Sequence, residues 1–435
     1  MKNKINLYKL YCLSFLLLTA GLLSAQYTET IEESFPAKSE VTILHRRGPV
    51  KVIKATDGKV SFQATIRFDA ASEAEAQKLK KALIVKGNDT GSRIDITSSS
   101  DIKNMKTING KSTIELKDGT KIKGIKKLEI ALVVKVPELK KLRVESRYHE
   151  VEVDAQVSEM LLLQTYNSEL KIADISGDLQ LNDKYSKGTV GAFRNAQMEL
   201  YESKIEFGKG REVEVNAKYS TLRFPGLDAL AAQSYENKVY VGNVKGKIEI
   251  NDKYSKFEFE DIQDALMDLY ETDITANTIQ KAQIKSKYAD LRFTAANDIY
   301  FATSYEDELQ VNDLGTLRAG ASKYTEYKIV NLNGALELDS YEDDIEIENP
   351  ASTIKTIRIK GKYTNLNCPF PSSMRFKMDM VGKYGSIDLD EDDLNYSTYI
   401  KKGSELKLVG TRNNATDTDA NFAFDCYECK IRLKN

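Results

Sequence analysis

The sequence predicts an all-β protein, a β-solenoid similar to a parallel β-helix, with a small α+β cap in its N-terminal region. Three observations support this prediction: a repeat of 17 or 18 residues, alternation of apolar and polar residues within the repeat, and one shift of that alternation in every repeat. A fixed period of this kind determines the architecture before local propensities are considered, because each repeat must bury its apolar face against its neighbours.

A pair of residues with two spellings, Lys-Tyr and Tyr-Glu, marks the repeat and alternates along the chain. Aligned on the residue before the pair, both spellings belong to one unit. In residues 286–293 and 304–311, an apolar residue follows this preceding residue five positions later, and a second follows two positions after that. Most steps are 17 to 19 residues long, and the last two are 21. The preceding residues, about fourteen in all, fall at positions 146, 165, 183, 200, 217, 234, 252, 269, 286, 304, 322, 340, 361 and 382.

The alternation within each repeat predicts strands joined by a corner. Residues 213–217 and 248–252 alternate apolar and polar side chains, which is typical of a strand with one buried face. Five residues, an odd number, separate the residue before the pair from the next inward position, so the alternation shifts once at a corner. Each rung is therefore expected to contain a strand, a corner, a second short strand and a return loop. A meander of antiparallel hairpins is the alternative, but hairpins favour Asn-Gly or Asp-Gly corners, which this repeat lacks.

Stacked rungs would place the pairs in two columns, one alternating Lys with Tyr and the other alternating Tyr with Glu. Unbroken Lys or Glu columns would bring like charges together, at a few tenths to about 1 kcal/mol per contact. Interposed tyrosines avoid this cost and offer Lys cation–π contacts of about 0.5–1 kcal/mol each. We interpret the columns as a structural ladder that sets the register, with a ligand-contacting stripe as the alternative. The candidate contact residues are Tyr201, Tyr235, Tyr270, Tyr305, Tyr341, Lys218, Lys253, Lys287 and Lys323.

The chain is expected to divide into four parts. Residues 1–25 resemble a signal peptide, because lysines precede an apolar run and Ser24-Ala25 precedes a cleavage position before Gln26. Residues 26–140 form the N-terminal α+β capping region, with a helix from Glu73 to about Ile84 whose Ser72 and Glu75 make a capping box. Residues 141–395 carry the solenoid repeats, and residues 396–435 form a C-terminal capping segment.

Composition argues against several functional classes. The formal net charge is −2 with 29% charged residues of both signs intermixed, so no nucleic-acid partner is expected. Two histidines in 435 residues make a histidine-based triad or metal site improbable. After the signal peptide no apolar stretch approaches the roughly 20 residues of a membrane-spanning helix, so we expect an exported protein that is periplasmic, outer-membrane-associated or extracellular. We also expect a monomer.

The cysteines and the carboxylates do not predict a catalytic, cofactor or metal site. Cys426 and Cys429 have the spacing of a redox or zinc half-motif, but they lie in an apparent strand where residues three apart point to opposite faces, and no second pair exists. A disulfide from Cys368 to one of them, or buried free thiols, is expected. Residues 417–421 match the opening of a calcium loop but lack its glycine. Some β-helices are polysaccharide lyases or hydrolases, but here the carboxylates recur with the repeat, which favours a structural role.

These features together resemble a family of exported, adhesin-like β-solenoid proteins of Bacteroidota-type bacteria, mostly of unknown function. The resemblance depends on the signal peptide, the opening strands around residues 44–52, the Val136-Pro137 strand end leading into residues 142–148, and the tyrosine rungs, and it covers most of residues 30–390. The family implies a surface or periplasmic location and an adhesive or scaffolding role. We expect an unidentified protein or glycan of the cell envelope as partner. It supplies no catalytic residues. A glycan-binding module that uses the tyrosines and a polysaccharide lyase or hydrolase are the alternatives.

Overall fold

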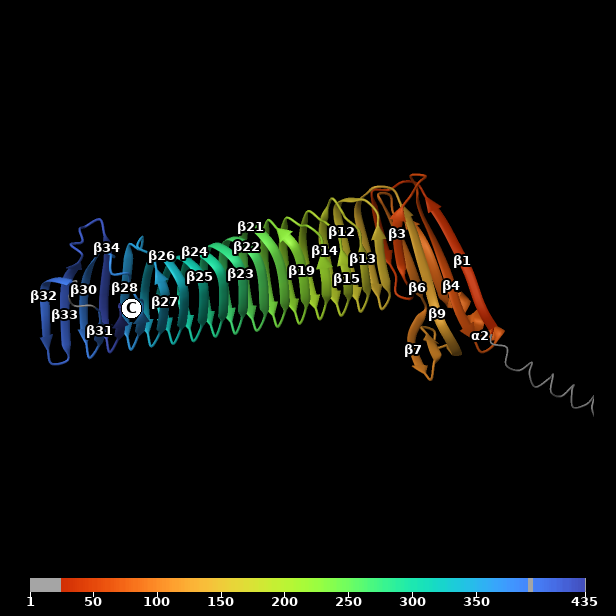
Figure 1. Ribbon diagram of the computed structural model, residues 1–435. Coiled ribbons are helices and arrows are strands. Elements are labelled where there is room, and N and C mark those ends of the chain that lie inside the picture. The colour runs from red at the N-terminus through yellow and green to blue at the C-terminus, as the bar shows by residue number, and fades with distance from the viewer. Residues whose placement is uncertain (1–24, 390–393, 435) are drawn as a thin grey trace, which may run out of the picture. The chain divides into compact units, whose positions relative to one another are not determined.

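The computed structural model describes residues 25–389 and 394–434, so the predicted signal peptide lies outside the described residues except for Ala25. The chain folds as a β-solenoid with one helix among the described residues, α2 (Glu73–Ala82) (Figure 1). The predicted fold class is therefore confirmed, and the parallel pairing of most strands rules out a hairpin meander. The chain divides into two compact units, unit 1 (residues 25–178 and 186–190) and unit 2 (residues 179–185 and 191–434).

Unit 1 combines antiparallel strands with the first parallel rungs. Antiparallel pairing joins β1, β4 and β9, whereas β10 pairs in parallel with both β2 and β12. Since β11 likewise pairs in parallel with β3, the parallel stack of this unit already includes β2 and β3. The strands are β1 (Ala25–Phe35), β2 (Glu40–Leu44), β3 (Val50–Lys54), β4 (Val60–Ala70), β5 (Leu83–Asp89), β6 (Arg93–Ser100), β7 (Ile102–Ile108), β8 (Lys111–Leu116), β9 (Lys121–Val136), β10 (Leu139–Arg147), β11 (Glu150–Asp154), β12 (Val157–Tyr166), β13 (Glu169–Ile172) and β15 (Lys187–Val190).

The helix α2 (Glu73–Ala82) begins where the sequence predicts. The Ser72 hydroxyl accepts a hydrogen bond from the Glu75 amide at 3.3 Å, as in a capping box. The Glu75 carboxylate does not turn back to Ser72; it accepts a hydrogen bond from the amide of Lys123 at 2.8 Å. The helix ends at Ala82, because Leu83 has extended backbone and starts β5.

Unit 2 consists of parallel rungs whose spatial order mostly follows the chain. β16, β18 and β20 pair in parallel, and from β21 to β26 each strand pairs with the next along nearly its whole length (Figure 1). The strands up to β26 are β14 (Asp178–Lys184), β16 (Asn195–Tyr201), β17 (Lys204–Phe207), β18 (Glu212–Lys218), β19 (Thr221–Leu227), β20 (Ala229–Tyr235), β21 (Lys238–Lys253), β22 (Lys256–Tyr270), β23 (Asp273–Lys287), β24 (Asp290–Tyr305), β25 (Glu308–Lys323) and β26 (Glu326–Tyr341).

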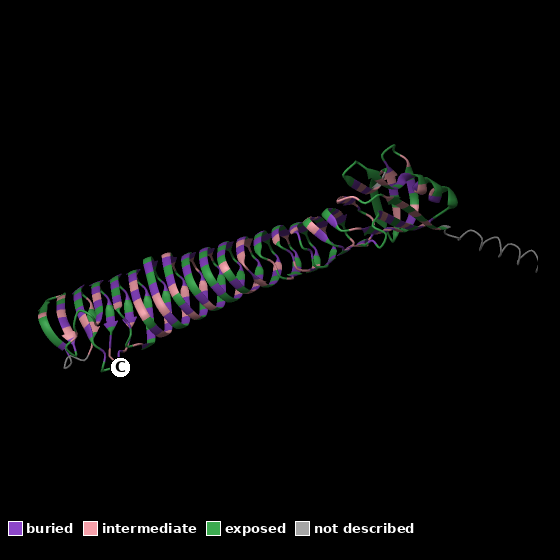
Figure 2. Cartoon of the chain, turned by 90° about the horizontal axis from the view of Figure 1, so that it is seen from above, coloured by how far each residue is buried: buried purple, intermediate pink, exposed green. Residues whose placement is uncertain are grey.

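The return of each rung differs from the expected loop in the middle of unit 2. In β21 to β26, the short second strand of one rung and the long strand of the next merge into a single strand of 15 or 16 residues. The chain therefore bends through the return without losing its ladder hydrogen bonds, which satisfies the backbone groups there. Buried and exposed residues alternate along these strands, so one side of each lines the core (Figure 2).

The corner between two strands is made by a residue in the left-handed conformation. The second residue of each Lys-Tyr or Tyr-Glu pair has positive φ, for example 67° at Tyr254 and 49° at Glu271. This conformation is unfavourable for residues other than glycine, and it recurs because each such amide bonds to the next rung. The amide of Tyr254 donates to the carbonyl of Tyr270 at 3.0 Å. The left-handed residue is the physical cause of the predicted shift in alternation.

The C-terminal rungs of unit 2 are stacked out of chain order. β34 pairs in parallel with β28 on one side and with β30 on the other, so it lies between two strands that precede it in the sequence (Figure 1). β33 and β32 then add antiparallel strands beyond β30. Residues 420–432, which the sequence analysis assigns to a capping segment, thus form a rung. The strands are β27 (Asp344–Pro350), β28 (Thr356–Lys362), β29 (Asn365–Asn367), β30 (Phe376–Lys383), β31 (Ser386–Asp388), β32 (Leu394–Lys402), β33 (Glu405–Arg412), β34 (Ala420–Tyr427) and β35 (Lys430–Arg432).

Candidate functional site

The tyrosines of the pairs form one continuous zigzag along the corners of unit 2, which we call the tyrosine ladder. Successive rings come alternately from the two columns and meet edge to face, with centroids 5.4–5.9 Å apart and interplanar angles of 74–87°. This is a favoured geometry for aromatic pairs. The members are Tyr185, Tyr201, Tyr219, Tyr235, Tyr254, Tyr270, Tyr288, Tyr305, Tyr324, Tyr341, Tyr363, Tyr427 and Tyr384.

The register brings the candidate contact residues together in one column. Tyr235 pairs with Lys218 on one side and Lys253 on the other, and the same alternation joins Tyr305, Lys323 and Tyr341. Tyrosines of this column are half-buried, whereas rings of the other column, such as Tyr219 and Tyr254, are 44% and 41% exposed. The ladder therefore holds its rings by mutual contact and also presents them to solvent.

Cation–π contacts occur in fewer rungs than the sequence suggests. The Lys287 ammonium lies 4.6 Å from the ring centroid of Tyr288 and 4.8 Å from that of Tyr305. Among the described residues, Lys218 and Lys253 make no such contact. The expectation of a cation–π contact for each Lys is wrong, because the neighbouring rings turn their edges and faces toward one another instead.

The glutamates of the Tyr-Glu pairs raise the pKa of neighbouring tyrosines. A hydrogen-bonded carboxylate, that of Glu236, raises the pKa of Tyr235, and Glu342 has the same effect on the pKa of Tyr341. These hydroxyls are therefore protonated at neutral pH, and each donates its hydrogen to the neighbouring carboxylate.

A second ladder, made of buried polar side chains, lies inside the same corners. The Asp307 carboxylate accepts hydrogen bonds from the hydroxyls of Ser286 and Ser304, both at 2.6 Å, and from the amide of Ala289 at 2.8 Å. Burial raises the pKa of Asp307 despite these bonds. The repeat pattern predicts only small residues before the pairs and does not predict this buried polar ladder. The signal was the polar residue two positions after the first residue of most pairs, as at Thr272, Thr325 and Thr364.

The cysteines lie in the core. Cys426 and Cys429 are both buried, because Glu428 between them is left-handed, with a φ of 55°, and turns the chain through a corner. The expectation that they point to opposite faces is therefore wrong, since it assumes a straight strand. Cys368 is also buried, and all three are free thiols rather than a disulfide. Burial raises the pKa of Cys368, and a hydrogen bond with Cys429, together with burial, raises the pKa of Cys426.

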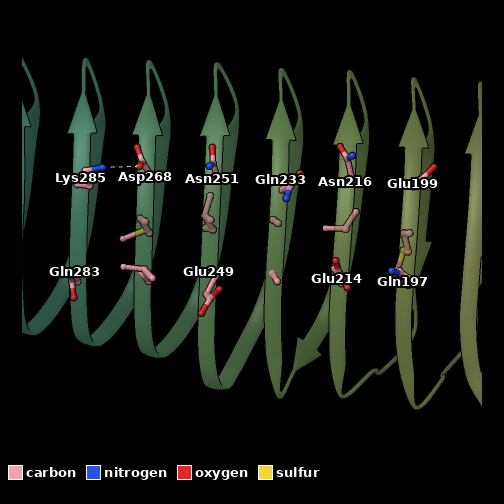
Figure 3. A pocket seen from close by; sticks show the side chains of 17 residues that line it. Gln197, Glu199, Glu214, Asn216, Gln233, Glu249, Asn251, Asp268, Gln283 and Lys285 are labelled. Atoms are coloured by element: carbon pink, nitrogen blue, oxygen red, sulfur yellow. Dashed lines mark hydrogen bonds and ion pairs between the residues drawn. The ribbon is translucent and has the colours of Figure 1, made fainter.

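The outer face next to the tyrosine ladder carries a hollow that we call the polar groove (Figure 3). It has a volume of about 460 Å³ and spans strands β16 to β23. Two columns of outward side chains line it, in register from rung to rung. The first column is Gln197, Glu214, Ala231, Glu249, Leu266 and Gln283. The second column is Glu199, Asn216, Gln233, Asn251, Asp268 and Lys285.

Other chemical groups are placed where they have structural partners. Nδ1 of His45 lies 2.6 Å from the hydroxyl of Ser98; the ring is buried, and this burial lowers its pKa to about 4. Asp419, in the calcium-like segment, accepts the amide hydrogen of Thr416 at 2.7 Å and pairs with Arg375 at 3.2 Å. Within residues 25–389 and 394–434, no three His, Cys, Asp or Glu side chains are grouped to hold a metal ion.

Comparisons with known proteins give structural matches alone. No family model matches the chain, and no curated protein matches it. Three solved structures are similar. One, described as a "putative adhesin" from Bacteroides fragilis, has 9% identity and a TM-score of 0.27, and covers 63% of this chain and 97% of its own. A "putative lipid binding protein" from Parabacteroides distasonis has 12% identity and a TM-score of 0.19, covering 78% and 96%. A "putative cell adhesion protein" from Clostridium sporogenes has 6% identity and a TM-score of 0.16, covering 93% and 99%.

These scores are too low to transfer the role of any residue from the three structures. The helix α2 has ten residues, and no helix in the described parts of the chain has the length and apolar character of a membrane span. The chain is a β-solenoid that resembles solved structures described as adhesin and cell adhesion proteins.

Proposed function

We propose that this protein is an exported, non-enzymatic, adhesin-like protein whose solenoid presents an extended surface to a partner on the cell envelope. The observation that carries the proposal is the tyrosine ladder, which continues without interruption through the rungs of unit 2 and leaves most rings of one column, such as Tyr219 and Tyr254, about 40% exposed. Tyrosine is enriched at recognition surfaces, because a rigid ring offers a large contact area at a small entropic cost.

The carboxylates support binding rather than catalysis. A hydrolytic site needs a pair of carboxylates, or a base with its partners, that stands apart from the repeat. Here the buried carboxylates of Asp307 and Asp343 are used in hydrogen bonds that hold the corners together. The outward carboxylates Glu214 and Glu249 are separated by Ala231 in the same column.

The candidate contact residues of the Lys/Tyr column enter this proposal as part of the surface. Tyr235 and Tyr270 are held in place by rings on both sides, so little side-chain entropy remains to be lost on binding. Lys253 lies between them, Lys218 lies on the other side of Tyr235, and both add exposed cations to the same edge.

Binding of the mature chain, residues 26–435, to intact bacterial cells tests the proposal. The labelled protein should bind saturably in flow cytometry, and the double substitution of Tyr219→Ser and Tyr254→Ser should weaken binding at least tenfold. Tyr399→Ser is the matched control, because Tyr399 is 51% exposed but lies outside the ladder. Pretreating the cells with periodate or with protease identifies a glycan or a protein partner. Absence of saturable binding would overturn the proposal, as would polysaccharide turnover that persists through purification.

A further inference from the structure

We infer that the polar groove of unit 2 binds a neutral, hydroxyl-rich glycan chain that runs across the rungs from β16 to β23. This inference deepens the proposed function, on which it rests, by naming a class of partner and the place where it binds. The groove residues are distinct from the candidate contact residues of the tyrosine ladder.

A small residue produces the hollow. In the first column, Ala231 pairs in register with Glu214 on one side and Glu249 on the other, so a methyl group stands between two long side chains. The resulting volume of about 460 Å³ lies within the range of small-molecule sites, roughly 300–1,000 Å³. Figure 3 shows the labelled polar side chains distributed over neighbouring strands rather than gathered at one point, and these strands run from β16 to β23.

The groove contains hydrogen-bonding groups that the protein itself leaves unused. Five side-chain amides line it, and none of them forms a hydrogen bond with another described residue. Each amide offers two donors and one acceptor oxygen. Sugar hydroxyls both donate and accept, so a row of free amides matches a polyhydroxylated chain better than a purely anionic or cationic one. The amides are Gln197, Asn216, Gln233, Asn251 and Gln283.

The charge of the groove selects against anionic polymers. Four carboxylates and one ammonium line it, which gives a net charge of −3. Lys285 already pairs with Asp268 at 3.2 Å, so the only cation is neutralised within the groove. Carboxylates accept hydrogen bonds from hydroxyl groups but repel uronates, sulfates and phosphates. A neutral glycan satisfies both conditions.

Apolar surface is available for the sugar rings. Leu266 is 39% exposed within the groove. The next outward position on the same strands belongs to the Lys/Tyr column, two residues after Gln233 and Asp268, so half-buried Tyr235 and Tyr270 border the groove. Parallel rungs repeat at about 4.8 Å, so groups of the same kind recur along the axis, as a repeating polymer requires.

Calorimetric titration with neutral hexasaccharides of glucose, mannose and xylose tests the inference, with hexagalacturonate as the anionic probe. The wild-type chain should bind at least one neutral hexasaccharide, and the triple variant Asn216→Ala, Gln233→Ala, Asn251→Ala should bind it at least tenfold more weakly. Ala231→Gln, which fills the hollow, should have a similar effect. Asn349→Ala is the matched control, because Asn349 is an exposed amide of β27 outside the groove. Unchanged thermal unfolding verifies that each variant is folded.

The outcomes separate this inference from the proposed function. If the groove variants bind like the wild type while Tyr235→Ser abolishes binding, the ladder is the site and the groove is not. Preferred binding of hexagalacturonate would also overturn the inference. Cell binding without binding of any neutral hexasaccharide would reject the glycan and leave an adhesin-like protein with a protein partner. Hexasaccharide binding without cell binding would instead reject the adhesin-like function and retain the groove.

Discussion

The middle and the C-terminal rungs of unit 2 build the same ladder by different routes. From β21 to β26, neighbours in space are neighbours in the chain, and the Lys-Tyr and Tyr-Glu pairs alternate in the sequence. At the C-terminal end two Lys-Tyr pairs, at residues 362–363 and 383–384, follow each other in the sequence. In space Tyr427 pairs in register with both Lys362 and Lys383.

The difference teaches that alternation is a requirement of neighbours in space rather than of neighbours in the chain. Without β34, Lys362 and Lys383 would meet in one column, and like charges directly opposite one another cost a few tenths to about 1 kcal/mol. The inserted rung places the Tyr427 ring between them, 5.7 Å from Tyr363 and 5.8 Å from Tyr384. The edge-to-face zigzag is thereby unbroken.

The largest effect is expected from deleting residues 420–435. This deletion removes β34 and leaves β28 and β30 without their shared partner, and it removes Phe422, whose ring stacks on Phe370 and Phe376 at 4.8 and 4.5 Å. Loss of one buried phenylalanine alone costs about 3–5 kcal/mol. Hydrogen exchange should show β28, β30 and β33 losing amide protection while β21 to β26 keep theirs.

The single substitution Phe422→Ala is the milder version of this experiment, and Phe257→Ala on β22 is its counterpart in the middle, since Phe257 is fully buried. We expect comparable losses of unfolding free energy from both. If the amides of β30 keep their protection in the deletion variant, the placement of β34 between β28 and β30 is contradicted.

An intermediate effect is expected inside the corners, where the two regions differ in chemistry. One middle rung has a carboxylate, that of Asp307, two positions after the first residue of its pair, whereas the rung of β34 has Cys429 at the corresponding position. Asp307→Ala leaves two buried hydroxyls and a buried amide without their acceptor and should cost about 3 kcal/mol. Cys429→Ala should cost about 1 kcal/mol, because it removes only a small buried thiol. Denaturant unfolding of both variants gives the comparison.

The variant Asp307→Asn adds a test by pH. Burial raises the folded-state pKa of Asp307 above its ordinary value of about 3.9, so the folded chain binds this proton more readily than the unfolded chain. The resulting stabilisation is complete below the ordinary value and is lost as the pH rises through the raised value. The unfolding free energy of the wild type relative to Asp307→Asn should therefore increase as the pH falls from 7 toward 4. A relative decrease would contradict the assignment.

An effect smaller than that of Asp307→Ala is expected in the tyrosine ladder, where equivalent substitutions can be compared directly between the two regions. Tyr270→Ser in the middle removes edge-to-face contacts with Tyr254 and Tyr288, and Tyr427→Ser removes those with Tyr363 and Tyr384. Each such contact contributes about 0.5–1.5 kcal/mol, so each substitution should cost about 1–3 kcal/mol. Equal losses of unfolding free energy, measured by thermal or denaturant unfolding, would show that the ladder is equally stable at β34 and in the rungs that follow the order of the chain.

Much of the fold was predictable, because the repeat determines both the length of each rung and which side chains point into the core. The shift in alternation at the pairs predicts a corner, and the left-handed residues, such as Tyr254, supply it. The inserted rung was missed, although its signals were present: two consecutive Lys-Tyr pairs, two 21-residue steps and a Tyr-Glu pair at residues 427–428. The Tyr-Glu pair at residues 427–428 lies between Cys426 and Cys429, whose spacing also resembles a redox or zinc half-motif.

The candidate site was only partly predictable. The column of Tyr201 and Lys218 follows from the repeat, since equivalent positions must stack. The polar groove does not, because its hollow depends on one alanine between two glutamates that are neighbours in space but 17 and 18 residues away in the chain. The buried polar ladder depends in the same way on which side chains meet inside the corner, which periodicity does not specify.

The inserted rung also imposes an order of assembly. A chain that emerges from its N-terminus first presents β28 and then β30, but these two strands cannot reach their final spacing until residues 420–432 have appeared. Until then each exposes an unpaired strand edge, which is a template for aggregation and a target for proteases. Completion of this end is thus a late, long-range event, while the rungs from β21 to β26 can add one after another. A chain that stalls or is cut before residue 420 would keep these unpaired strand edges at its C-terminal end. Cellular proteases could therefore distinguish it from a complete chain.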